Sequence, residues 1–104
     1  MNIKELEKQI KSIYLPLLNK FDYIYSLCSP LFIDNNHNDI INDYLNKIEN
    51  AISELKKIQK EIIKELEKMI ENDNFDNYYK LMHIYNEIYV YIRNLEFFKY
   101  KIKN

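Results

Sequence analysis

Glycine does not occur in this 104-residue sequence, and neither does threonine or tryptophan. Phosphate-binding loops, dinucleotide-binding turns and tight hairpins need backbone conformations that glycine adopts at the lowest cost. The missing glycine therefore argues against nucleotide sites of these kinds. Asparagine is the best substitute in the left-handed region, so clusters of asparagine indicate where the chain turns.

Cysteine and long apolar runs are also scarce, and both observations bear on location. Cys28 is the one cysteine, so no internal disulfide can form, and the sequence has no Asn-x-Ser/Thr glycosylation site. The longest apolar run, residues 13–18, is much shorter than the ~20 residues of a membrane span. The N-terminus is charged and periodic, unlike a signal peptide. We expect an intracellular, cytoplasmic protein with no membrane association.

The residues that are present form a biased but balanced composition. Hydrophobic residues make up 47%, charged residues 30%, and the net charge is −1. These values are typical of a globular domain without a global field that would attract nucleic acid. Isoleucine, lysine, asparagine and tyrosine supply more than half of the chain. This bias favours AT-rich codons and indicates a very AT-rich genome, so tyrosine and lysine carry less functional weight than usual.

Two clusters of asparagine and aspartate divide the chain into three long segments. The clusters lie at 34–39 and 72–77. Apolar residues recur at helical spacing in each segment, which predicts helices over about 3–28, 39–71 and 76–101. Helices joined by short connections lie antiparallel to each other.

The predicted fold is therefore all-α, an antiparallel up-down-up three-helix bundle with long helices, in a single domain over 1–104. Pro16 falls near the middle of the first helix. It removes a backbone donor there, and because it projects to the polar side it predicts a bend rather than a break. In length and layout the bundle resembles a single spectrin-type repeat, a likeness of topology that carries no function.

The apolar stripes predict which residues form the core. The second helix keeps near-heptad spacing, with only Gln59 polar on its seam. The third helix is apolar almost all round, and eight residues make its main stripe. They are Tyr78, Leu81, Met82, Tyr85, Ile88, Tyr89, Ile92 and Leu95.

A partial calcium-loop pattern precedes the second helix. The first three side-chain ligands of such a loop are matched by Asp34, Asn36 and Asn38. The match then ends, because Asp39 replaces the glycine of the sharp turn and Leu45 replaces the final glutamate. The pattern is typical of a helix cap in an asparagine-rich loop, with Asn38 or Asp39 as the capping residue.

Zinc and catalytic sites are predicted to be absent. Cys28, His37 and His83 do not make a closely spaced ligand set. His83 and Glu87 lie one turn apart and are expected to form a surface pair. Cys28 lies on the apolar stripe of the first helix, which favours a buried, inert thiol. We expect a protein that is not an enzyme and has no catalytic residues, metal or cofactor.

Basic residues occur in two places that suit nucleic acid. Four lysines lie on the outer face of the second helix, namely Lys57, Lys60, Lys64 and Lys68. Glutamates flank them, as on an ordinary solvated helix. The C-terminal stretch mixes aromatic residues with Arg93, Lys99, Lys101 and Lys103. That combination can hold RNA by charge and stacking. Pairing of this basic stretch with the acidic start of the second helix explains its charge equally well.

A second apolar stripe on the third helix is the most specific feature. Tyr79, Val90 and Phe97 fall within about 20° of each other, opposite the main stripe, and Tyr91 and Phe98 flank them. A bundle with one core needs only one apolar face on each helix, so a second face is typical of a protein-binding surface. Two alternatives to a binding surface stay open: codon bias scatters aromatic residues, or the bent first helix covers more of the third.

Two functional hypotheses follow. The first is a non-catalytic binding protein that occupies the surface of a macromolecular partner through the third helix. It is similar in general character to small phage or mobile-element inhibitors of host defence, such as anti-CRISPR proteins. The second is a self-associating structural or adaptor bundle in which the same face forms a homodimer. An RNA-binding accessory protein that uses the C-terminal lysines ranks third.

Overall fold

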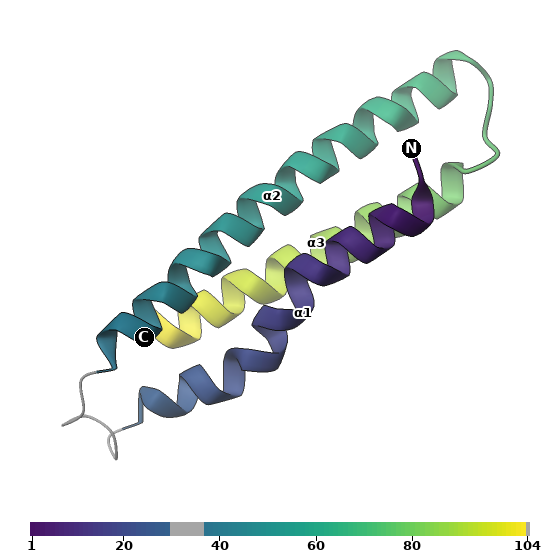
Figure 1. The fold of residues 1–104 in the computed structure, drawn as a ribbon. Coiled ribbons are helices and arrows are strands. Elements are labelled where there is room, and N and C mark those ends of the chain that lie inside the picture. Colours follow the sequence, from purple (N-terminus) through teal and green to yellow (C-terminus); the bar gives the residue numbers. More distant parts are fainter. Residues whose placement is uncertain (30–36, 104) are drawn as a thin grey trace.

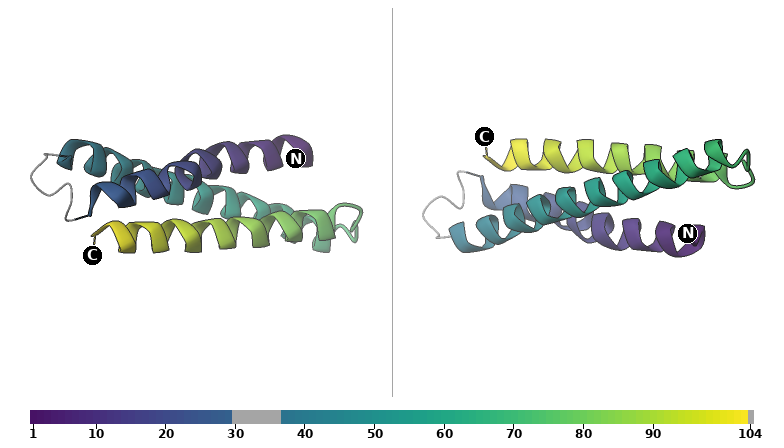
Figure 2. Two further views of the ribbon diagram at one scale, coloured as in Figure 1. Left: turned by 90° about the horizontal axis from the view of Figure 1, so that it is seen from below. Right: turned by 90° about the horizontal axis from the view of Figure 1, so that it is seen from above.

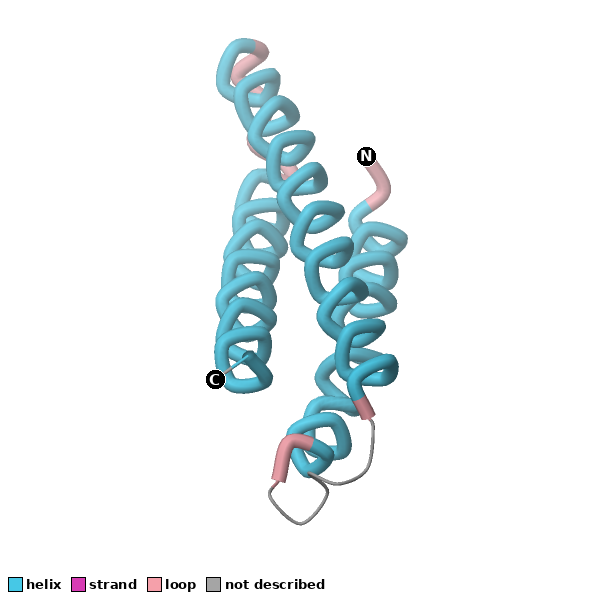
Figure 3. The backbone as a smooth tube through the Cα atoms, turned by 90° about the vertical axis from the view of Figure 1, so that its left-hand side faces the viewer, coloured by secondary structure: helices cyan, strands magenta, loops and turns pink. Residues whose placement is uncertain are grey.

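Three α-helices make up almost all of the chain that the structure describes, as Figure 3 shows. The computed structural model describes residues 1–29 and 37–103, and in these residues it contains no strand. The helices α1 (Ile3–Leu27), α2 (Asn38–Glu71) and α3 (Tyr78–Lys103) run up, down and up, and each packs against the other two (Figure 1). The predicted antiparallel three-helix bundle is confirmed.

The bundle is long and narrow. Its principal extents are 61 × 19 × 16 Å and its radius of gyration is 17.2 Å, whereas a compact domain of this length has a radius of gyration of about 13 Å. α3 runs straight along the long axis in both views of Figure 2. Among the described helices, none combines the length and the apolar content that crossing a bilayer requires.

α1 begins at a side-chain cap and bends at its proline. The side-chain oxygen of Asn2 accepts a hydrogen bond from the backbone N–H of Glu5 at 3.2 Å, which satisfies one of the unpaired donors of the first turn. Pro16 is exposed, so its ring does not disturb the core. It has no N–H to donate to the carbonyl one turn earlier, and the ribbon of α1 changes direction part-way along its length (Figure 1). The predicted bend is confirmed.

α2 begins one residue earlier than the sequence predicts. His37 occupies the N-cap position and makes no side-chain capping bond, while Asn38 is already the first helical residue. The expected capping role of Asn38 or Asp39 is therefore wrong. Asp39 still lies in the first turn, where its negative charge favours the helix dipole.

α2 ends in a Schellman motif built without glycine. Asp73 has a φ of 52°, in the left-handed region where glycine usually stands. The N–H of Asn74 donates to the carbonyl of Met69 at 3.0 Å, and the N–H of Asp73 donates to the carbonyl of Ile70 at 3.3 Å. These two bonds satisfy carbonyls at the helix end and turn the chain toward α3. In a chain without glycine, an aspartate adopts this conformation at a steric cost.

The core of the described chain consists of apolar and aromatic side chains, with no buried polar or charged residue. In α2 the seam is completed by Ile58, which is buried, rather than by Gln59. In α3 the buried residues are Leu81, Ile84, Ile88, Ile92, Leu95, Phe98 and Ile102. Tyr89, which the sequence assigns to the main stripe, is 53% exposed. At 100° per residue, the buried stripe of α3 is rotated by about 70° from the predicted one, toward Phe98.

α1 and α3 are parallel and are held in register by two stacked pairs of aromatic rings. Tyr14 stacks on Tyr91 with ring centroids 4.0 Å apart, and Phe21 stacks on Phe98 with centroids 4.3 Å apart. In both helices the paired residues are seven positions apart, so successive pairs lie two turns apart on matching faces. These rings are the contact that orients α3 toward α1.

Two tyrosine hydroxyls form hydrogen bonds between helices of the bundle. The hydroxyl of Tyr44 donates to the carbonyl of Leu17 at 2.7 Å, and the side-chain amide of Asn94 donates to the hydroxyl of Tyr14 at 2.8 Å. Burial, with a smaller contribution from the neighbouring Tyr14, raises the pKa of Tyr44 to about 12. The phenol of Tyr44 is therefore kept neutral as a hydrogen-bond donor.

Replacing Asp73 with glycine tests the cost of the Schellman motif. We expect Asp73→Gly to raise the free energy of unfolding by about 1 kcal/mol, because glycine adopts positive φ without steric penalty. Denaturant unfolding measures the change. Asp76→Gly is the matched control in the same connection, at a residue without positive φ. An equal gain in the control would contradict a steric cost at Asp73.

Tyr44→Phe tests the buried hydroxyl. At neutral pH the variant should lose about 1 kcal/mol of unfolding free energy with the lost hydrogen bond. The ordinary pKa of 10.0 applies to the unfolded chain and about 12 to the folded one. The contribution of Tyr44 is thus complete below pH 10 and is lost as the pH rises toward 12. Urea unfolding across this range should show a smaller fall for the variant than for the wild type, and equal falls would refute the assignment.

Candidate protein-binding surface

The metal-ligand candidates of the sequence are not brought together. Within the described chain, no group of three or more His, Cys, Asp or Glu side chains is placed to hold a metal ion. His83 and Glu87 form the predicted surface pair on α3, with Nε2 and Oε1 3.3 Å apart. Asp34 and Asn36, from the partial calcium pattern, lie outside the described residues.

Cys28 lies at the C-terminal cap of α1 and is exposed, so the prediction of a buried residue is wrong. Cys28 keeps helical backbone angles, but it stands at the end of α1, where fewer residues cover it. Its Sγ still lies against two carbonyl oxygens, that of Ile24 at 3.6 Å and that of Ile102 at 4.0 Å. Partial burial raises the pKa of the thiol, which lowers the fraction of reactive thiolate at neutral pH.

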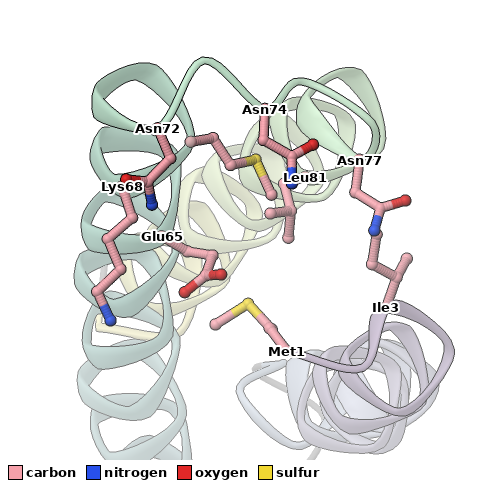
Figure 4. Close-up of a pocket in the computed structure, with 9 residues that line it drawn as sticks. Met1, Ile3, Glu65, Lys68, Asn72, Asn74, Asn77 and Leu81 are labelled. Carbon is pink, nitrogen blue, oxygen red and sulfur yellow. The ribbon is translucent and has the colours of Figure 1, made fainter.

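A pocket of about 260 Å³ opens where the N-terminus of α1 meets the α2–α3 connection (Figure 4). Its polar lining consists of asparagine amides with one carboxylate, from Glu65, and one ammonium, from Lys68. Figure 4 shows Glu65 pointing toward Met1, while the Lys68 side chain runs along α2. One carboxylate among amides provides neither a metal-ligand set nor an acid–base pair.

The outward side of α3 carries a row of exposed apolar side chains, which we call the outer α3 surface. Its members are Tyr79, Tyr89, Val90, Phe97 and Tyr100. Tyr79 is 82% exposed, and Val90 and Phe97 are each 51% exposed. The row extends over about 30 Å of helix at 1.5 Å per residue. The three residues that the sequence places at the centre of a second stripe are therefore on the surface.

Tyr91 and Phe98, which the sequence places beside that stripe, belong to the inner side of α3 instead. Phe98 is 7% exposed and stacks on Phe21. Tyr91 is partly buried and stacks on Tyr14. Burial, followed by the neighbouring Glu87 carboxylate, raises the pKa of Tyr91. Both residues are removed from the candidate surface because α1 covers them.

Tyr89 and Tyr100 are the members that sequence reasoning missed. The rotation of the buried stripe toward Phe98 brings the opposite edge of α3 to the surface, and both tyrosines lie on that edge. The seven-residue spacing of Tyr14 and Phe21 on α1 matches that of Tyr91 and Phe98, but it also matches that of Tyr78 and Tyr85, so spacing alone does not separate the two edges of α3. The structure selects the match with Tyr91 and Phe98. That match pairs residues 77 positions apart.

Two cations lie over rings of the outer α3 surface. The guanidinium carbon of Arg93 is 5.9 Å from the centroid of the Tyr89 ring, and an Arg93 nitrogen lies 3.4 Å from the Tyr89 hydroxyl. The Lys101 ammonium is 5.6 Å from the centroid of Phe97. Both separations are within the range of cation–π attraction. The surface is therefore aromatic and positively charged.

The other basic residues point elsewhere. Four lysines are exposed on the side of α2 that faces away from the core, namely Lys57, Lys60, Lys64 and Lys68. Lys99 instead forms an ion pair with Glu49 at the side of α2. The hydrogen bond from Lys99 lowers the pKa of the Glu49 carboxyl, with smaller help from the charge of Lys103. The C-terminal end is thus paired with the first half of α2, which was one of the two expectations for this segment.

The fold does not require the outer α3 surface. The inner stripe of α3 supplies its share of the core, while more than half of each of the Tyr79, Tyr89 and Phe97 side chains stays open to solvent. No family model matches the chain, and no curated protein or solved structure does either. A role for this surface must be inferred from its exposure, geometry and charge.

Two neighbouring phenylalanines provide a direct test of the two sides of α3. Phe98→Ala should lower the free energy of unfolding by about 3 kcal/mol, because it removes a buried ring and leaves a cavity. Phe97→Ala, at an exposed ring, should change it by less than about 0.5 kcal/mol. Thermal or denaturant unfolding of both variants measures the difference. Similar losses in the two variants would contradict the placement of Phe97 outside the core.

Proposed function

We propose that the protein is a non-catalytic binding protein that docks on a protein partner through the outer α3 surface. The observation that carries this proposal is the row of four aromatic rings and one valine along the outward side of one straight helix. Exposed aromatic residues gathered in one place are a common mark of interaction sites in soluble proteins. Each ring can bury a large area against a partner at a small cost in side-chain entropy.

The distribution of other exposed apolar residues supports the choice of α3. In the 34 residues of α2, the large hydrophobic residues that are exposed are Ile40, Ile63 and Ile70, and none is aromatic. The shorter α3 exposes five, and four of them are aromatic. Codon bias acts on the whole chain and does not by itself concentrate rings on one helix face. α1 exposes four large hydrophobic residues, of which two are aromatic: Leu15, Leu18, Tyr23 and Tyr25. The number of exposed rings, four on α3 against two on α1, therefore favours α3 as the interaction surface.

A protein of this kind acts by occupying a surface of its partner. Such action needs shape, apolar area and charge, and it needs no group that performs chemistry. The small phage and mobile-element inhibitors of host defence, to which the sequence is similar in general character, are the class of protein that we propose. A homodimer through the same surface and an RNA complex are the competing functions.

The double variant Tyr79→Ser/Phe97→Ser tests the proposal. We expect the tagged wild type to retain a foreign protein from its native lysate, in the presence of nuclease, and the double variant to lose it. Both changes remove exposed rings, so the helical circular dichroism signal should stay the same. Tyr23→Ser/Ile63→Ser is the matched control, because it removes one exposed ring and one exposed aliphatic side chain from α1 and α2.

The outcomes separate the three functions. Retention that disappears in Tyr79→Ser/Phe97→Ser but persists in the control supports the outer α3 surface. Equal retention by all three proteins refutes it. Recovery of the protein alone, with a dimer in light scattering that the double variant abolishes, supports self-association. A partner released by nuclease supports RNA binding instead.

A further inference from the structure

The charges on α3 are arranged asymmetrically around the helix. Arg93 and Lys101 extend over Tyr89 and Phe97 on the outer α3 surface. α3 has only two acidic residues, and neither places a free negative charge at the centre of that surface. Glu87 faces His83 and Tyr91 on the side toward α1.

Glu96, the second acidic residue of α3, lies at the edge toward α2. It lines a groove of about 430 Å³ whose charged members are three lysines and two glutamates, namely Lys56, Lys99, Lys103, Glu49 and Glu96 itself, and Tyr100 lines the same groove. The cations that lie over rings of the outer α3 surface are Arg93 and Lys101, and both belong to the C-terminal half of α3. A partner that covers it must bring negative charge to meet Arg93 and Lys101, or leave both cations without a counter-charge.

The spacing of the apolar residues indicates the shape of that partner. Tyr79 and Tyr100 lie three heptads apart, and Val90 and Phe97 lie one heptad apart. α3 is straight (Figure 2), so these residues follow a nearly linear ridge about 30 Å long. A row of exposed apolar side chains along one side of a straight helix is complementary to a second helix that packs alongside it, with apolar residues at its own a and d positions.

We propose that the occupant of the outer α3 surface is an amphipathic helix of a partner protein, with acidic residues flanking its apolar stripe. This inference rests on the proposed function and names the chemistry of its partner. The apolar stripe of such a helix packs on the five exposed side chains, and its carboxylates reach Arg93 and Lys101. This is the helix-on-helix mode of recognition, in which charge sets the choice of partner.

The same charges disfavour the two other occupants. In a dimer with parallel α3 helices, a second copy of the chain brings its own Arg93 and Lys101 opposite the first pair, so like charges meet across the interface. RNA is attracted by clustered positive charge, but four lysines that RNA would use lie on the outer side of α2 instead. The chain as a whole has a net charge of −1. An acidic amphipathic helix pairs its carboxylates with Arg93 and Lys101 and also covers the exposed rings of the outer α3 surface.

The test uses two synthetic helical peptides of three heptads, both with leucine at every a and d position. One carries glutamate at the flanking e and g positions, and the other carries lysine there. Fluorescence anisotropy measures binding of each labelled peptide to the full chain. We expect the glutamate peptide to bind at least about tenfold more tightly than the lysine peptide, the effect of roughly two favourable charge pairs.

Charge-reversal variants locate the effect on α3. Arg93→Glu/Lys101→Glu should weaken binding of the glutamate peptide by about tenfold and strengthen binding of the lysine peptide. Lys57→Glu/Lys64→Glu makes the same change in net charge on the outer side of α2, and it should leave both affinities within about twofold. Tyr79→Ser/Phe97→Ser should abolish binding of both peptides.

Each alternative result overturns the inference. Equal binding of the two peptides, failure of the glutamate peptide to bind, or an equal loss in the α2 control refutes an acidic helical partner. Tighter binding of a labelled uridine oligonucleotide than of the glutamate peptide assigns the surface to nucleic acid. If lysate capture depends on Tyr79 and Phe97 while the peptide results fail, the binding function stands and only the acidic helix is refuted. If neither depends on these residues, both proposals fail.

Discussion

The two stacked ring pairs between α1 and α3 are the constraint on which the rest of this structure depends. α1 and α3 are parallel and distant in sequence, so no short connection sets their relative position. Tyr14 on Tyr91 and Phe21 on Phe98, at 4.0 and 4.3 Å between centroids, fix both the register and the rotation of α3. Stacked aromatic pairs add directional preference to the area that they bury. An aliphatic seam would leave the rotation of α3 less defined.

The rotation of α3 determines the surface that the protein presents. Phe97 and Phe98 are adjacent in sequence and lie about 100° apart around the helix, so directing Phe98 toward α1 directs Phe97 to the solvent. The same rotation exposes Tyr89 and Tyr100 and brings Arg93 and Lys101 to the outer side. The rotation of α3 about its axis thus determines both which aromatic residues hold the bundle together and which are proposed to bind a partner.

Much of the fold follows from the sequence, and the candidate surface follows only in part. Helix spacing, the two asparagine clusters and Pro16 predict three helices, their order and the bend, because each depends on local periodicity. Tyr79, Val90 and Phe97 are correctly placed outside for the same reason. The sequence misplaces Tyr89, Tyr91 and Phe98 because α3 is apolar almost all round. Its periodicity therefore does not determine which side of the helix faces the core. The contacts with α1 and α2, which the periodicity of α3 does not encode, decide which side of α3 faces the core.

The elongated shape has a consequence for how the protein behaves in solution. A particle of 61 × 19 × 16 Å experiences more friction than a sphere of the same mass, and it rotates more slowly about its short axes than about its long axis. The monomer should therefore elute early from a sizing column, at a position where a compact protein of larger mass is expected. Elution volume alone would misassign such a monomer as a dimer. Its rotational diffusion is also anisotropic, so the nuclear magnetic relaxation of each backbone amide depends on the angle between its N–H bond and the long axis. Most N–H bonds lie near that axis, because helical N–H bonds point along the helices.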